Sequence, residues 1–139
     1  ALTTFYSIPG AYLVLMPNNP TASGISRKAE GSDRDTAKQI ISQLNAPEHV
    51  GIILRTAGLD RSQEELQWDL DNLLEQWKAI QKTSETAQAP TLIQQGESGF
   101  KRIIRDQLAQ NTTKIIVDNS ELYQEIIFIR FLWHRMWHW

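Results

Sequence analysis

The chain has 139 residues and a mass of 15.9 kDa, which fits one domain or a part of a larger protein. Hydrophobic residues make up 41% and charged residues 22%, so the composition is that of a folded protein and excludes a disordered chain. Because 14 Lys and Arg residues face 16 Asp and Glu residues, the net charge of −2 excludes a globally basic surface. Any site for a polyanion must therefore be local.

The chain contains no cysteine, which excludes disulfides, thiolate zinc sites and cysteine nucleophiles and fits a reducing compartment. It begins at Ala1 without a signal region, and we interpret it as an excerpt of a longer chain. The apolar run near the C-terminus is interrupted by charged residues and histidines and is too short to span a bilayer. We therefore do not expect a transmembrane protein.

The first part of the chain predicts a β-hairpin. Residues 3–7 and 11–16 are rich in β-branched, aromatic and aliphatic side chains, and the turn signal Ile8-Pro9-Gly10 separates them. Prolines and asparagines at 17–20 end the second strand, and a short edge strand is expected around Ile25.

A helix over residues 33–44 and a strand over residues 50–54 are predicted next. Ser32 and Asp35 have the spacing of a capping box at the start of the helix. The strand is apolar without alternation, which predicts that it is covered on both faces. It ends at Arg55-Thr56-Ala57-Gly58.

The longest predicted helix covers residues 63–84 and begins with a second capping box, formed by Ser62 and Glu65. Its apolar residues lie within roughly 120° of one another around the helix, which indicates a core stripe. They are Leu66, Leu70, Leu73, Leu74, Trp77 and Ile80. Trp68 points nearly opposite, toward another part of the parent protein or toward solvent.

The remaining pattern predicts a strand at 91–93, a helix, a strand at 114–118 and a last helix from Ser120. The residues that mark the first of these helices are Phe100, Ile103, Ile104 and Leu108. This order of elements predicts a mixed α/β (α+β) fold of layered strands and amphipathic helices.

Arg55 and Thr56 are the most suggestive candidates for a binding site. A guanidinium and a hydroxyl at the end of a rigid strand can donate several hydrogen bonds to a phosphate, and the small residues Ala57 and Gly58 let the backbone approach closely. The alternative is a surface arginine that pairs with a carboxylate such as Asp60.

A second group of cations precedes the first predicted helix: Arg27, Lys28, Arg34 and Lys38. They offer contacts to a nucleic-acid backbone, but acidic residues are interleaved with them, which favours a solvated surface of mixed charge.

Other titratable residues carry weaker signals. The carboxylate pairs Asp69 with Asp71 and Glu64 with Glu65 do not face each other on a helix, so we interpret all four as solvated charges. His49 is interpreted as a loop residue. The spacing of His134 and His138 suits a metal, but no acidic residue follows to complete a site.

Several segments stand in order along the chain: LTTF (2–5), YLVLMPNNP (12–20), GISRK (24–28), EGSDR (30–34), GIILRTAG (51–58), EELQWDL (64–70), LLEQWKAI (73–80), APTLIQQ (89–95) and KIIVDN (114–119). In this order and spacing they resemble the central part of the catalytic region of the bacterial ribonuclease E/G family. The resemblance covers about residues 1–125.

The resemblance implies a division of the chain into four parts. Residues 1–5 would end an OB-fold RNA-binding domain, 6–100 would form a 5′-sensor domain, and 101–125 would begin a segment like ribonuclease H. Residues 126–139 leave the family pattern, and we interpret them as an apolar partner-binding or membrane-surface tail or as a non-native ending.

The resemblance also implies function. The chain would be an RNA-binding, 5′-monophosphate-sensing fragment of a cytoplasmic, homo-oligomeric endoribonuclease that acts on single-stranded RNA, not DNA, in RNA processing and decay. Arg55 and Thr56 match residues that grip the terminal phosphate, and Gly10 and Val14 match places where the backbone closes over the terminal nucleotide.

Magnesium for catalysis and zinc for linking the oligomer are implied for the parent family. The residues that bind these ions lie further downstream in the family, so we expect no catalytic and no metal-binding residue in this chain. A competing hypothesis is a structural or oligomerisation fragment without RNA binding of its own, which associates through the Trp68 side and the C-terminal tail.

Overall fold

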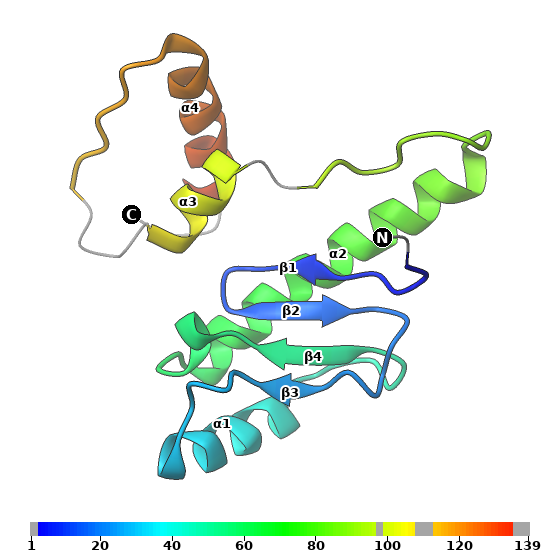
Figure 1. Cartoon of the computed structure of the whole chain (residues 1–139), viewed down its shortest axis with the longest axis vertical. Helices are drawn as coiled ribbons and strands as arrows, with labels where there is room; N and C mark the ends of the chain where they lie inside the picture. Colours follow the sequence, from blue (N-terminus) through cyan, green and yellow to red (C-terminus); the bar gives the residue numbers. More distant parts are fainter. Residues whose placement is uncertain (1–2, 97–98, 108–112, 135–139) are drawn as a thin grey trace. The chain divides into compact units, whose positions relative to one another are not determined.

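A computed structural model of the chain describes residues 3–96, 99–107 and 113–134. The fold is α+β, as predicted, and it divides into two compact units, residues 1–106 and 107–139. In chain order the elements are β1 (Ile8–Pro9), β2 (Leu13–Met16), β3 (Gly24–Ile25), α1 (Gly31–Gln43), β4 (Gly51–Leu54), the 3-10 helix η1 (Thr56–Gly58), α2 (Gln63–Thr86), α3 (Gly99–Gln107) and α4 (Ser120–His134) (Figure 1).

The sheet has the strand order β1-β2-β4-β3. β2 runs antiparallel to both β1 and β4, whereas β3 runs parallel to β4. Leu13 pairs with Leu54 and Leu15 with Ile52, so these four side chains lie on the same face of the two central strands. The edge strand predicted around Ile25 is confirmed as β3.

The hairpin is confirmed, but its first strand and its turn were placed wrongly. The strand is Ile8–Pro9, and the chain turns between Gly10 and Leu13, where the Gly10 N–H donates to the Leu13 carbonyl at 2.8 Å. Pro9 is tolerated because β1 is an edge strand and needs no proline N–H there.

The described residues before Ile8, predicted as part of a strand, are held by one side chain. Asn18 Oδ1 accepts the Tyr6 N–H at 2.9 Å, and Asn18 Nδ2 donates to the Thr4 carbonyl at 2.7 Å. A side-chain amide therefore provides the two bonds that a neighbouring strand would otherwise provide.

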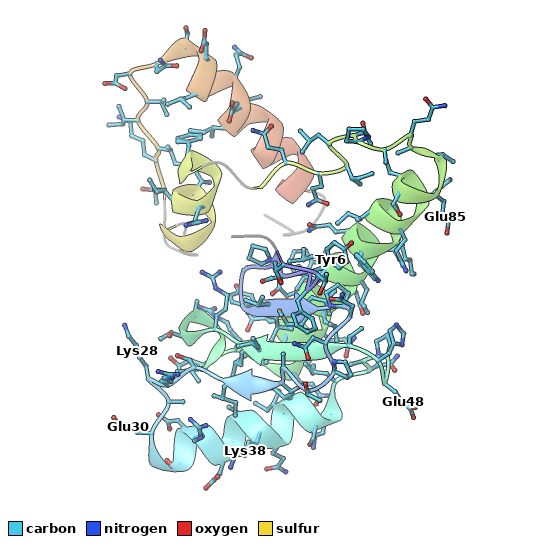
Figure 2. All side chains as sticks on the ribbon, turned by 45° about the vertical axis from the view of Figure 1, so that its right-hand side comes forward. Tyr6, Lys28, Glu30, Lys38, Glu48 and Glu85 are labelled. Carbon is cyan, nitrogen blue, oxygen red and sulfur yellow. The ribbon has the colours of Figure 1, made fainter. Side chains whose placement is uncertain are left out.

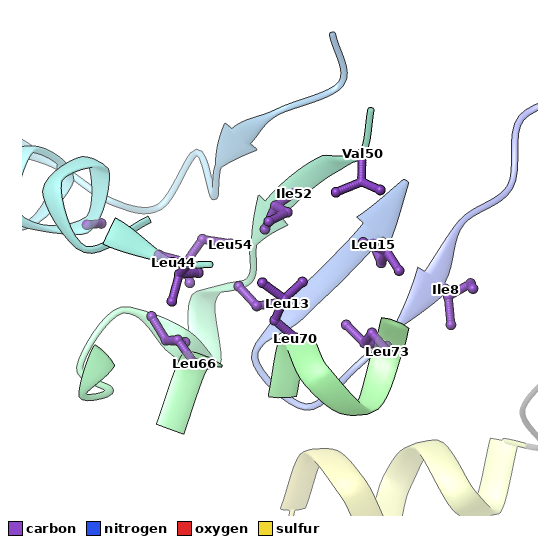
Figure 3. Packing of buried hydrophobic residues seen from close by; sticks show 11 residues of the cluster. Ile8, Leu13, Leu15, Leu44, Val50, Ile52, Leu54, Leu66, Leu70 and Leu73 are labelled. Atoms are coloured by element: carbon purple, nitrogen blue, oxygen red, sulfur yellow. The ribbon is translucent and has the colours of Figure 1, made fainter. Parts of the chain in front are cut away.

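The core lies on one face of the sheet, between the strands and the helices α1 and α2 (Figure 3). Its fully buried side chains are Leu13, Leu15, Leu54, Leu66, Leu70 and Leu73. Burial of a leucine side chain stabilises a fold by roughly 1.5–3 kcal/mol. Val14 and Ile53 lie on the opposite face and are only half-buried, whereas Gly51 on that face is buried, so the predicted coverage of residues 50–54 on both faces holds only in part.

Helix α1 is confirmed, but the capping box predicted from Ser32 and Asp35 is wrong. The N-cap residue is Glu30, which makes no side-chain capping bond, and the helix starts at Gly31 with φ 53°. A glycine tolerates this left-handed backbone, so the chain turns into the helix without a serine cap.

Helix α2 confirms both predictions made for it. Ser62 Oγ accepts the Glu65 N–H at 3.3 Å, and Glu65 Oε2 accepts the Ser62 N–H at 3.0 Å, which is a complete capping box. The predicted stripe faces the core, where its N-terminal members are buried and Leu74, Trp77 and Ile80 pack partly against it.

The C-terminal part confirms two helices but neither predicted strand. α3 and α4 are present, while residues 91–93 and 114–118 pair with no strand in the part of the chain that the structure describes. An apolar run becomes a strand only where another strand is available to pair with its backbone. Leu92 and Ile116 lie in such unpaired runs and are 77% and 81% exposed. Of the apolar residues that mark α3, Ile103 is exposed, whereas Ile104 is buried.

Several predictions concern residues outside the described part. These are Leu108, the chain end at residues 1–2, and residues 135–139 with His138. The side chain of His134 is likewise outside what the structure describes. Among the described residues, no helix combines the length and the apolar character that a membrane span requires.

We expect Leu70→Ala to lower the free energy of unfolding by about 2–5 kcal/mol, because it opens a cavity where a side chain with 0% exposure packs. Leu92→Ala, at a position that is 77% exposed, is the matched control and should change it by less than about 0.5 kcal/mol. Urea unfolding measures both values. A Leu70→Ala chain as stable as the control would contradict this description of the core.

Candidate functional site

Arg55 follows β4 directly and reaches the turn of the hairpin between β1 and β2. Its Nη1 donates to the Gly10 carbonyl at 2.7 Å and to the Ala11 carbonyl at 2.9 Å. The backbone is tied to the same strand, since the Arg55 N–H donates to the Tyr12 carbonyl at 2.8 Å. The half-buried guanidinium is therefore held at a fixed place by residues that lie 44 and 45 positions away in the sequence.

Thr56 is exposed and begins η1, and its hydroxyl contacts a second hydroxyl. Thr56 Oγ1 lies 2.8 Å from Ser26 Oγ, and Ser26 Oγ also accepts the Lys28 N–H at 3.3 Å. The Ser26 N–H in turn donates to the Leu54 carbonyl at 2.9 Å. The segment after β3 thus supports the Thr56 side chain, a contact that sequence reasoning missed because it depends on the parallel pairing of β3 with β4.

Gly10 and Val14 have different relations to Arg55. The Gly10 carbonyl bonds directly to the guanidinium, as described above. Val14 pairs with Pro9 on one side and Ile53 on the other, so its backbone polar groups face neighbouring strands. What Val14 presents on the open face of the sheet is its half-buried side chain. The structure therefore brings Gly10, Arg55 and Thr56 to one end of the sheet, whereas Val14 lies within β2.

Asp69 is the residue that sequence reasoning misjudged most. We expected a solvated carboxylate, but Asp69 is only 4% exposed and accepts three backbone N–H groups of the hairpin turn. Oδ1 accepts the Ala11 N–H at 3.0 Å, and Oδ2 accepts those of Tyr12 and Leu13, both at 2.8 Å. Three such bonds satisfy a buried carboxylate.

A signal for this role was present in the sequence. At 100° per residue, Asp69 lies beside the apolar stripe of α2, whereas Asp71 lies well away from it. A charged residue at the edge of a buried stripe requires a buried partner. Asp71 is exposed and accepts from Gln67 Nε2 at 2.8 Å, so the prediction of a solvated charge holds for Asp71 alone of the two.

Tyr12, in the same turn, is a half-buried aromatic residue. The Arg61 guanidinium lies 5.1 Å from the centre of its ring. Burial raises the pKa of Tyr12 above 10.0, against the lowering effect of Arg61. The phenol therefore stays neutral at physiological pH and adds no negative charge to the neighbourhood of the turn.

The remaining candidates are surface residues. Arg27, Lys28, Arg34 and Lys38 are exposed, and Lys38 lies 3.6 Å from Asp35, which agrees with a solvated surface of mixed charge. Figure 2 shows Lys28, Glu30 and Lys38 pointing outward at the α1 edge. His49 is exposed, as a loop residue would be. Glu64 is exposed and Glu65 serves the capping box of α2.

Among the described residues, no group of side chains is suited to the magnesium or zinc implied for the family. Within residues 3–96, 99–107 and 113–134, no three His, Cys, Asp or Glu residues gather into a group suited to a metal ion. The chain also has no cysteine to serve as a zinc ligand. Asp69, a buried carboxylate among the described residues, already accepts three backbone N–H groups.

Comparison with known proteins shows the family of the chain. The sequence model of the ribonuclease E/G family matches residues 7–134. The chain is 49% identical to ribonuclease E of Haemophilus influenzae over 125 residues, or 90% of the chain and 13% of that protein. It is 49% identical to ribonuclease E of Escherichia coli over 124 residues, or 89% of the chain and 12% of that protein.

A more distant relative is ribonuclease E of Synechocystis sp., 31% identical over 117 residues, or 84% of the chain and 17% of that protein. The chain thus spans less than a fifth of the length of these three relatives. The chain belongs to the ribonuclease E/G family.

We expect Gly10→Ala to destabilise the chain by about 1–3 kcal/mol, because the added methyl group would overlap the Asp69 carboxylate. A Cβ atom at this position would lie 2.6 Å from Asp69 Oδ2. Gly24→Ala is the matched control, since a Cβ atom there meets nothing within 4 Å. Thermal and urea unfolding compare the two variants. Equal stability of both would show that Gly10 and Asp69 do not pack as described.

Proposed function

We propose that this chain is the part of a ribonuclease E/G-type endoribonuclease that recognises the 5′-monophosphorylated end of single-stranded RNA. The observation that carries the proposal is the fixed guanidinium of Arg55, which is held by the Gly10 and Ala11 carbonyls and is followed in the chain by the Thr56 hydroxyl. Membership of the family and the similarity to three proteins named ribonuclease E support an RNA substrate.

A fixed guanidinium suits this task because a terminal phosphate offers a compact group of charged oxygens. A monophosphate at the chain end carries about 1.5–2 negative charges at pH 7, more than the single charge of an internal phosphodiester. Charge-assisted hydrogen bonds from Arg to phosphate are strong, and little side-chain entropy is lost when the donor is already ordered. The site therefore favours an RNA end over an internal position.

The contact between the Ser26 and Thr56 hydroxyls orders the second donor of the site, the Thr56 hydroxyl. Because Ser26 Oγ accepts the Lys28 N–H, Ser26 can donate its own proton to Thr56 Oγ1. In this arrangement the Thr56 proton is directed to the ligand. Thr56 and Arg55 then act together on one phosphate, while the half-buried side chain of Val14 offers an apolar contact to the nucleotide.

The remaining functions of the parent protein are part of the same proposal. We infer that the whole enzyme hydrolyses RNA with magnesium in RNA processing and decay, in the cytoplasm and as a homo-oligomer linked by zinc. In that account residues 6–100 sense the 5′ end and prefer a monophosphate to a triphosphate. Residues 1–5 and 101–125 belong to the neighbouring RNA-binding and ribonuclease H-like parts.

The test is a titration of single-stranded oligonucleotides of one sequence, bearing a 5′ phosphate or a 5′ hydroxyl, at fixed salt. Wild type should bind the phosphorylated RNA more tightly. Arg55→Ala should weaken that binding about tenfold or more, because charge-assisted hydrogen bonds contribute roughly 1.5–3 kcal/mol, and should hardly change binding of the hydroxyl form. Thr56→Val should give a smaller loss in the same direction.

Arg34→Ala is the control for charge alone, since Arg34 is an exposed arginine of α1. It should weaken both oligonucleotides equally and leave the ratio of the two dissociation constants unchanged. The proposal is wrong if wild type shows no preference for the phosphorylated end, or if Arg55→Ala retains the full preference.

A further inference from the structure

Two peptide groups of the hairpin turn are held from both ends. One peptide group joins the Gly10 carbonyl to the Ala11 N–H, and the next joins the Ala11 carbonyl to the Tyr12 N–H. Arg55 Nη1 binds the two carbonyls at 2.7 and 2.9 Å. Asp69 binds the two N–H groups of the same peptides at 3.0 and 2.8 Å.

This geometry transmits orientation from one side chain to the other. A peptide group is planar and its N–H and C=O point in opposite directions, so fixing the N–H also fixes the direction of the carbonyl. A carboxylate at the N–H end and a guanidinium at the carbonyl end polarise each peptide in the same sense, which strengthens both bonds. Asp69 thus sets the acceptors that place Arg55.

Two further observations tie Asp69 to this task. It also accepts the Leu13 N–H at 2.8 Å, which joins the turn to the start of β2. A Cβ atom on Gly10 would lie within 3 Å of three Asp69 side-chain atoms, so the turn and the carboxylate fit only with a glycine at this position. Asp69 itself is fixed by α2, whose neighbouring Leu66, Leu70 and Leu73 are fully buried.

We propose that Asp69 is a positioning residue of the 5′-phosphate site, acting on Arg55 through the Gly10–Ala11 and Ala11–Tyr12 peptide groups. The inference rests on the proposed function for the identity of the ligand. Its structural part, that Asp69 fixes the position of the Arg55 guanidinium, does not depend on the ligand. Asp69 does not touch the phosphate in this account. Its contribution is specificity for the phosphorylated end, which depends on the placement of the guanidinium.

Asp69→Asn is the most informative variant. Asparagine keeps the shape and one acceptor, which can serve the Tyr12 and Leu13 N–H groups that Oδ2 serves now. Its NH₂ group then meets the Ala11 N–H, donor against donor, where Oδ1 accepts now. We expect the preference for the 5′-phosphorylated oligonucleotide to fall roughly threefold to tenfold, with much less change for the hydroxyl form.

Asp71→Asn is the matched control on the same helix, because Asp71 is exposed and accepts a hydrogen bond from Gln67 Nε2 of its own helix at 2.8 Å. It should leave the preference unchanged. The double variant Asp69→Asn with Arg55→Ala separates positioning from general damage. If Asp69 acts through Arg55, the double variant has the preference of Arg55→Ala alone, whereas independent damage would add to it.

A second measurement needs no RNA. The ¹⁵N side-chain signals of Arg55, assigned by their loss in Arg55→Ala, report rotation of the guanidinium. Rotation should be slow in wild type and in Asp71→Asn and faster in Asp69→Asn. If Asp69→Asn does not fold, Gly10→Ala takes its place, because it disturbs the same contact from the turn.

The outcomes distinguish the two proposals. If wild type prefers the phosphorylated end, Asp69→Asn must show both a smaller preference and a faster rotation of the Arg55 guanidinium. If only one of these changes, or neither, the positioning role is wrong while the proposed function stands. If wild type shows no preference but rotation of Arg55 depends on Asp69, the proposed function fails and the control of Arg55 by Asp69 is retained.

Discussion

The three hydrogen bonds from the hairpin turn to Asp69 are the interaction on which the described site depends. They bring α2 and the β1–β2 hairpin together around a carboxylate that has almost no contact with solvent. A buried charge is tolerated only where hydrogen bonds replace its hydration, and the turn supplies those bonds because its N–H groups converge. The same turn directs two carbonyls outward to Arg55.

The two faces of the sheet have different roles in this arrangement. On the covered face, leucines of β2, β4 and α2 form the core, and Asp69 joins this layer as its one buried charged residue among the described residues. On the open face, Val14 and Ile53 remain half-buried beside the end of β4. Arg55 and Thr56 follow at that end, so the candidate site is open to solvent while Asp69, which holds the turn, is protected from water.

Local patterns predicted the fold where local chemistry decides the outcome. The spacing of Ser62 and Glu65 and the leucine stripe of α2 needed no distant partner to be recognised, and both were correct. The similar spacing of Ser32 and Asp35 failed because Gly31 begins the helix in a left-handed conformation. The strands predicted at 91–93 and 114–118 failed because an apolar run cannot reveal whether a pairing partner is present.

The candidate site was predictable only in part for the same reason. Arg55 and Thr56 are adjacent in sequence, and their place at the end of a buried strand indicated an anion site. Ser26 and Asp69 were missed because their partners lie 30 and 56–58 residues away. Rules for charge pairs on one helix treat Asp69 as solvated. Its place beside the apolar stripe indicates burial, but only the tertiary packing of α2 against the hairpin shows which groups it binds.

The central claim is that the turn at Gly10–Leu13 and the segment Arg55–Thr56 form one binding site for a terminal phosphate. The most direct measurement is a ¹⁵N NMR titration of the chain with a dinucleotide that carries a 5′ phosphate, compared with the same dinucleotide without it. The account predicts that the phosphate shifts the signals of Gly10, Ala11 and Thr56 together with the Arg55 side chain. Shifts confined to the cations around α1, or identical shifts with both dinucleotides, would contradict it.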